Sequence, residues 1–210
     1  MDEILLSHLP VSEILRYLNC SSDDQKMRIL AKSCAEELCK TARPRTLRHT
    51  FPIALEDNSV IIGKNALLLP GQDLMHVLKG CTKAVLFCAT LGTSVDLLIR
   101  REQLCDMTRS VVLDSCASTA IEIVCDQVEK AVQEEYPESY LSARYSPGYG
   151  DLPVSVQKDF LALLDAPRKI GLCATDTNIL TPRKSVTAVI GLSDQPLKKI
   201  KKNCATCLIR

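Results

Sequence analysis

The sequence predicts one α+β domain, in which an antiparallel sheet packs with long helices and a helical extension precedes the main body. Residues 106–134 repeat apolar side chains at helix spacing over several turns. Short alternating runs between 41 and 69 are typical of antiparallel strands. The apolar run 84–92 ends at a glycine and is typical of a strand buried on both faces. We therefore expect residues 1–45 to form a helical N-terminal extension packed on an α+β domain at 46–210.

The N-terminal part should contain two helices. Residues 11–18 and 23–40 follow the helix period, and Ser22 or Asp23 can cap the start of the second helix. The change to alternating patterns near residue 41 indicates where the strands begin.

The remaining elements are predicted in turn along the chain. Helices are expected at 71–79, 93–101, 106–134 and 154–164, with Pro167 ending the last, and strands at 84–92, 170–179 and 184–192. Within the longest helix, residues 115–120 are six small residues that permit close approach of another backbone or of a ligand. Tight helix packing is the favoured interpretation.

Charge and hydropathy exclude several classes of protein. The net charge is +1, which gives no general affinity for nucleic acid or for an anionic membrane. No run of about 18 apolar residues is present that would span a bilayer. The first residues carry acidic side chains where a signal peptide needs basic ones, so we expect a cytoplasmic protein.

Cysteine is abundant, with 11 residues that mostly lie in apolar surroundings. Buried free cysteine behaves as a small hydrophobic residue, so we expect reduced thiols. Cys204 and Cys207 have the spacing of a metal or redox pair, but no second pair accompanies them and the three histidines are isolated. We predict no metal site and interpret this pair as packing or incidental thiols, with metal or redox work as the alternative.

The stretch ARYSPGYGDLP, residues 143–153, is the most unusual segment. Its two glycines and two prolines prevent a regular element, yet it also carries an arginine and two tyrosines. Standard motifs for nucleophilic, phosphate-binding or metal chemistry are absent from the sequence, so no catalytic residue is assigned.

The residues 144–149, RYSPGY, resemble the Arg-x-x-Pro-Gly-Tyr signature of the activation domain of cobalamin (vitamin B12)-dependent methionine synthase. In that family a long helix precedes the signature and a short helix follows it. A TP-x-x-SV strand comes next, to which residues 181–191 are similar. The resemblance covers about 80–200, and short stretches near the start, at 89–92 and in the tail look similar to short, free-standing members.

The resemblance implies a methionine synthase activation domain-like fold that binds S-adenosylmethionine. Such a domain supports the reductive methylation of oxidised cobalamin held by a partner, within a methyltransferase of methionine biosynthesis. The expected partners are the cobalamin-binding or catalytic modules of methionine synthase or another corrinoid protein, together with a reducing flavoprotein. The chain would be part of that enzyme rather than an enzyme by itself.

The resemblance also implies roles for the loop residues. Arg144 would pair with the ligand's carboxylate, in a cleft without a permanent acidic partner. Backbone groups around Ser146 would contact the adenine or the amino-acid end, and Pro147 with Gly148 would shape the turn. The Tyr149 ring would lie against the ligand, where an aromatic face favours a sulfonium cation.

One further residue is carried over from the family. Ser118 stands where the larger members have a glutamate on the long helix, so we expect weaker ligand binding here. Two other functions remain open, a non-catalytic docking partner of a corrinoid protein and a small-molecule sensor. The loop itself has a structural alternative, a turn with Arg144 in an ion pair and packed tyrosines.

Overall fold

The computed structural model describes residues 6–21, 23–64 and 66–197, and the chain divides into two compact units. The helical unit consists of Met1–Thr46, Ala89–Val128 and Thr181–Ser185. The sheet unit consists of Leu47–Cys88, Glu129–Leu180 and Val186–Arg210. The expected separation of an N-terminal extension at residue 45 stays a prediction.

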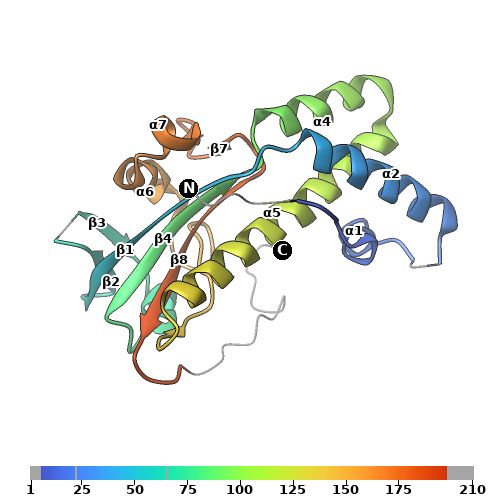
Figure 1. Ribbon diagram of the computed structural model, residues 1–210. Coiled ribbons are helices and arrows are strands. Elements are labelled where there is room, and N and C mark those ends of the chain that lie inside the picture. The colour runs from blue at the N-terminus through green and yellow to red at the C-terminus, as the bar shows by residue number, and fades with distance from the viewer. Residues whose placement is uncertain (1–5, 22, 65, 198–210) are drawn as a thin grey trace. The chain divides into compact units, whose positions relative to one another are not determined.

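Six strands form one sheet in the order β3-β2-β1-β4-β8-β5 (Figure 1). They are β1 Arg45–Glu56, β2 Ser59–Ile62, β3 Leu67–Pro70, β4 Lys83–Thr90, β5 Tyr140–Leu141 and β8 Ser185–Ser193. The pairs β1–β2, β2–β3 and β5–β8 are antiparallel. A separate two-stranded sheet joins β6 Cys173–Ala174 to β7 Leu180–Thr181.

The central strand β4 runs antiparallel to β8. At one end of β4, the Thr82 N–H donates to the Leu192 carbonyl, and at the other end the Leu91 N–H donates to the Lys184 carbonyl. Residue numbers therefore rise along β4 as they fall along β8. All β4 residues after Lys83 are buried, which confirms the prediction of a strand covered on both faces.

Helices cover the β1–β3 part of the sheet within the sheet unit (Figure 1). They are α3 Gln72–Val77, α6 Gln157–Leu164 and α7 Ala166–Ile170, with a 3₁₀ turn at Val154–Val156 before α6. Phe160 from α6 is fully buried in one core cluster with Ile62 and Leu69 of the strands. Burial of such side chains is the main favourable contribution to the stability of this unit.

The helical unit contains α1 Val11–Tyr17, α2 Gln25–Thr41, α4 Thr93–Cys105 and the part of α5 Met107–Glu135 that ends at Val128. The small residues of α5 permit close packing, and the Cys116 thiol lies 3.9 Å from the Ala31 carbonyl of α2. Glu37 of α2 forms ion pairs with Arg101 of α4 and Arg109 of α5, and these ion pairs connect the three helices. The predicted role of the small residues in helix packing is thus confirmed.

Two predicted details are wrong. Residues 170–179 do not form one strand, because α7 extends to Ile170 and a turn at 175–178, with Asn178 at a φ of 61°, separates β6 from β7. Asp165, with a φ of 57°, ends α6, and Pro167 lies in the first turn of α7. Proline is tolerated there, since the first turn of a helix leaves its N–H groups unpaired. The cap of α2 is Asp24, whose side chain accepts the Met27 N–H at 3.0 Å, and Ser22 lies outside the described residues.

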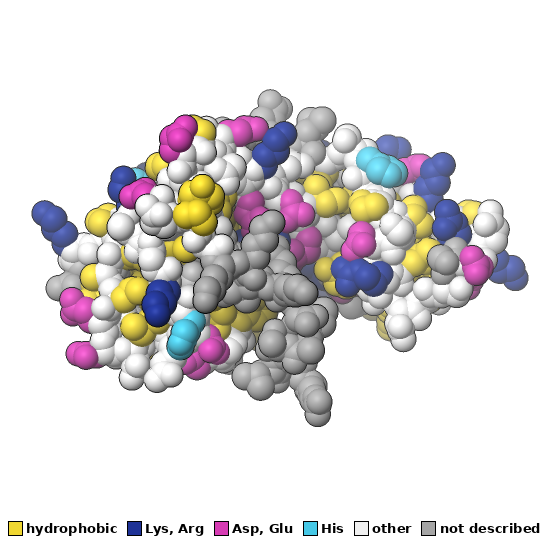
Figure 2. Space-filling model, turned by 90° about the horizontal axis from the view of Figure 1, so that it is seen from below, with side chains coloured by type: hydrophobic (Ala, Val, Ile, Leu, Met, Phe, Trp, Pro, Cys, Tyr) yellow, Lys and Arg dark blue, Asp and Glu magenta, His cyan; other side chains and the backbone are white. Residues whose placement is uncertain are grey.

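The nine cysteines in the described ranges are not joined in disulfides, and Cys204 and Cys207 lie outside those ranges. Burial raises the pKa of the Cys88 thiol to about 12, so this side chain behaves as a hydrophobic residue. The described residues contain no group of three or more histidine, cysteine, aspartate or glutamate side chains that could hold a metal ion. None of the helices described is both long and apolar enough to cross a membrane. Figure 2 shows acidic and basic side chains interspersed on the face that it draws.

Candidate functional site

The loop at 143–153 is fastened to strand β8 in the sheet unit. Tyr145 and Val189 exchange backbone hydrogen bonds of 3.0 and 2.8 Å. Ser142 adds two more contacts, because its N–H donates to the Gly191 carbonyl at 3.0 Å and its hydroxyl accepts the Gly191 N–H at 2.8 Å. These bonds continue the β5–β8 pairing into the loop, so the loop begins from a fixed position on the sheet.

The turn itself is compact. The Tyr149 N–H donates to the Ser146 carbonyl at 3.1 Å, and the Gly148 N–H donates to the Leu152 carbonyl at 2.8 Å. Pro147 is buried beneath the turn. Gly148 has a φ of 94°, and an added Cβ would lie 2.9 Å from Val154 Cγ1, so glycine is required here. The predicted turn-shaping roles of Pro147 and Gly148 agree with this geometry.

The two tyrosines of the loop differ in exposure. The Tyr145 hydroxyl donates to the Tyr149 carbonyl at 3.0 Å, and the two rings meet edge to face with centroids 6.3 Å apart. Burial, together with the negative charges of Asp73 and Asp151, raises the pKa of Tyr145 to about 12. Tyr149 is 48% exposed, so this ring stands on a fixed backbone and remains accessible to a ligand.

The end of the loop is held by a residue that the sequence analysis did not single out. Asp151 accepts the backbone N–H groups of Gln72 at 2.6 Å and Asp73 at 3.2 Å, and so caps the first turn of α3. Gly71 precedes these residues with a φ of 131°, and any side chain there would collide with the Asp151 carboxylate. A glycine before a helix signals such a close approach, but the sequence does not identify the partner.

Arg144 is paired with an acidic residue of the chain. Its Nε lies 3.1 Å from Oε1 of Glu129 in α5, and the two side chains are 12% and 30% exposed. The expectation that Arg144 has no permanent acidic partner is therefore wrong. A guanidinium that is buried to this extent needs a counter-charge, because an unpaired charge is costly to remove from water. The ion-pair part of the structural alternative is confirmed, and the two tyrosine rings contact each other although Tyr149 is 48% exposed.

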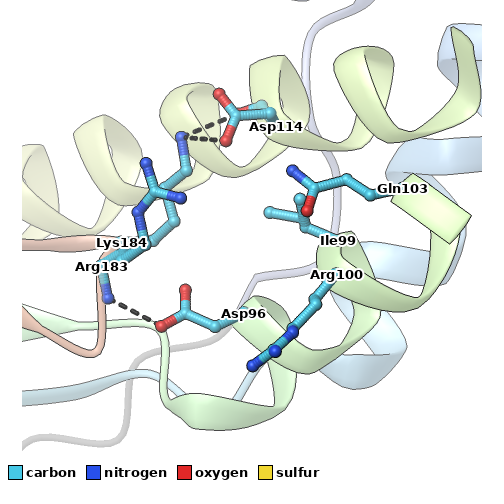
Figure 3. A pocket seen from close by; sticks show the side chains of 7 residues that line it. All are labelled: Asp96, Ile99, Arg100, Gln103, Asp114, Arg183 and Lys184. Carbon is cyan, nitrogen blue, oxygen red and sulfur yellow. Dashed lines mark hydrogen bonds and ion pairs between the residues drawn. The ribbon is translucent and has the colours of Figure 1, made fainter. Parts of the chain in front are cut away.

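Ser118 belongs to the helical unit and has partners of its own. Its hydroxyl donates to the Asp114 carbonyl at 3.1 Å and accepts a hydrogen bond of 2.9 Å from Lys184 Nζ. Lys184 Nζ also lies 3.0 Å from Asp114 Oδ1 (Figure 3). An ammonium group of the chain thus contacts the hydroxyl for which we expected a role in ligand binding. The sequence carries no signal for this contact, since 66 positions separate Lys184 from Ser118.

Comparisons with known proteins identify the fold. No protein-family model matches the chain, and no curated protein matches it. A solved structure described as the crystal structure of the MetH reactivation domain bound to AdoHcy is similar over 87% of this chain and 70% of that chain. Its TM-score is 0.67 and its sequence identity is 16%. The predicted α+β fold of the methionine synthase activation domain type is confirmed.

Proposed function

We propose that this chain binds S-adenosylmethionine at the loop 143–153 and supports the reductive methylation of cobalamin carried by a partner of the methionine synthase kind. The observation that carries the proposal is the shared fold with a reactivation domain that was solved with AdoHcy, which is the product of methyl transfer from S-adenosylmethionine. The signature-like residues Arg144–Tyr149 form a fixed turn with an exposed aromatic ring, which also supports it.

Each loop residue has a role in the proposal. The Tyr149 ring provides a face for the adenosine or the sulfonium group, and the backbone around Ser146 and Gly148 contacts the rest of the ligand. Arg144 holds the loop against α5 through Glu129, and in this proposal its guanidinium also lies near the ligand's carboxylate.

The proposed reaction needs positioning rather than acid–base catalysis. One electron from a reductant converts oxidised cobalamin to a form that attacks the methyl group of the sulfonium. The carbon–sulfur bond breaks and a carbon–cobalt bond forms, which leaves S-adenosylhomocysteine. A loop of fixed geometry contributes by holding the methyl group in line with the attacking metal and by excluding water.

Titration calorimetry with S-adenosylmethionine and S-adenosylhomocysteine tests the binding step. We expect weak binding to the wild type, which Tyr149→Ala weakens further because the ring contact is lost. Tyr140→Ala is the matched control, since Tyr140 is also 48% exposed and lies in the same unit. No heat from the wild type at millimolar ligand, or an equal loss in both variants, would contradict the proposed site.

A second function, docking without ligand chemistry, is favoured by one observation. Four large apolar side chains of α4 and of the start of α5 are each more than half exposed, namely Leu97, Leu104, Met107 and Val111. Large apolar side chains that stay exposed are a feature of many protein interaction surfaces. Absence of ligand binding, together with tight binding to a corrinoid protein, would favour this function.

A further inference from the structure

A cavity of about 390 Å³ lies within the helical unit (Figure 3). It is lined by Asp96, Ile99, Arg100, Gln103, Asp114, Arg183 and Lys184, which come from α4, α5 and the segment 181–185. Figure 3 shows Arg183 and Lys184 together on one wall, with Ile99 and Gln103 facing them from α4. The volume lies within the range of small-molecule sites, which is roughly 300–1,000 Å³.

The first wall of the cavity is electrically neutral and fixed. Lys184 Nζ has three oxygen partners, the Asp114 carbonyl at 3.1 Å, Asp114 Oδ1 at 3.0 Å and Ser118 Oγ at 2.9 Å. An ammonium group has three N–H donors, so these contacts use all of them. The Lys184 side chain is only 16% exposed, and its charge is balanced by that of Asp114.

The charges of the other ionisable lining residues do not cancel one another. Asp96 accepts the Arg183 backbone N–H at 2.8 Å, which ties the segment 181–185 to the first turn of α4. Arg100 and Arg183 are the two remaining cationic residues of the lining, and Asp96 is its remaining acidic residue. Within the described ranges neither guanidinium is paired with an acidic side chain, and the lining keeps one net positive charge beyond the Lys184–Asp114 pair.

We propose that this cavity binds the oxyanion of a small molecule, either a carboxylate or a phosphate group. A guanidinium presents a rigid fork of N–H donors that matches the oxygens of both groups, and two such forks border one cavity here. The Gln103 amide supplies a further donor, and the buried Ile99 side chain gives an apolar contact for the carbon part of the ligand. This site is made by the helical unit alone and does not rest on the proposed function of the loop.

The test is an NMR titration of the full chain with inorganic phosphate, glycerol phosphate and succinate at constant ionic strength. The backbone amides of the segment 181–185 and of α4 should shift in a saturable manner with at least one probe. Arg100→Gln and Arg183→Gln should each weaken that binding about 10-fold or more, because a charged hydrogen bond contributes roughly 1.5–3 kcal/mol. Arg45→Gln is the control, an exposed arginine of the same unit that does not line the cavity.

Each possible result of this titration either supports or overturns the proposed anion site. Preference for the phosphate compounds or for succinate, with loss in both cavity variants and not in Arg45→Gln, supports the site and identifies the chemical source of the anion. No saturable shift with any of the three probes overturns it. An equal weakening in the control variant also overturns it, because binding would then follow net charge alone. Circular dichroism of each variant checks the fold, and Arg100→Gln, on the exposed side of a helix, keeps the test decisive if Arg183→Gln unfolds.

Discussion

Arg144 shows what a single residue contributes to the loop and why its partner was missed. The sequence places Arg144 at the start of a signature-like segment, and chemistry alone suggests a ligand carboxylate as its partner. The structure instead gives it Glu129, a residue of the same chain on the preceding helix. The side chain is 12% exposed, which makes a permanent counter-charge necessary whether or not a ligand is bound.

Removal of this ion pair should therefore destabilise the protein. We expect Arg144→Ala to lower the free energy of unfolding by about 1.5–3 kcal/mol, since it removes a largely buried hydrogen bond between charged groups. Chemical denaturation of Arg144→Ala, Glu129→Gln and the double variant should show that the two changes are not additive.

The exposed pair Arg168–Asp165 provides the control for this measurement. Its side chains are 79% and 39% exposed, so Arg168→Ala should change the stability by no more than about 0.5 kcal/mol. A loss in Arg144→Ala that is no larger than this would show that the Glu129 contact contributes little.

Tyr145 should make the stability depend on pH in the alkaline range. Its pKa is raised from the ordinary value of 10.0 to about 12 in the folded chain. Below pH 10.0 the Tyr145 phenol is neutral in both the folded and the unfolded chain, so its contribution to stability is fully present. As the pH rises toward the higher value the unfolded chain loses its proton first, and that contribution is lost.

The comparison of wild type with Tyr145→Phe isolates this effect. The phenylalanine variant lacks the hydrogen bond to the Tyr149 carbonyl and should be less stable at neutral pH by about 1 kcal/mol. The difference in unfolding free energy between the two proteins should narrow as the pH rises above about 10. A difference that stays constant over this range would show that Tyr145 ionises equally easily in both states.

At the scale of elements, periodicity predicted most helices and strands but not the segment after α6. The 3.6-residue repeat of α5 and the apolar run of β4 are strong signals, and both elements lie close to their predicted bounds. Residues 170–179 were expected to form one strand, yet α7 extends to Ile170 and a turn with a left-handed Asn178 interrupts the segment. The backbone conformation of single residues cannot be predicted from the periodicity of hydrophobic residues.

The cap of α3 is an element-scale feature that can be tested. Asp151→Ala should lower the free energy of unfolding by about 1–2 kcal/mol, because two backbone N–H groups of the first turn lose their acceptor. Thermal unfolding measures the loss. Asp194→Ala is the control, because Asp194 is an exposed aspartate of the same unit. Equal stability of the two variants would show that the cap does not hold the loop to α3.

At the scale of the whole molecule, the sequence predicted the fold and the loop but not how the site residues are connected. The resemblance of residues 144–149 and 181–191 led to the α+β fold that the solved structure of a reactivation domain also has. The contacts of Arg144 with Glu129 and of Ser118 with Lys184 join segments that only folding brings together. Spacing within one sequence gives the residues of a site, whereas their partners depend on the tertiary structure.

A reactivation assay tests the proposed function most directly. A cobalamin-dependent methionine synthase that lacks its own reactivation domain, with oxidised cobalamin bound, is mixed with a reductant and with S-adenosylmethionine labelled on the methyl group. The chain should produce labelled methylcobalamin, Tyr140→Ala should retain this activity, and Tyr149→Ala should lose most of it. Formation of methylcobalamin at the same rate with and without the chain would contradict the proposed function.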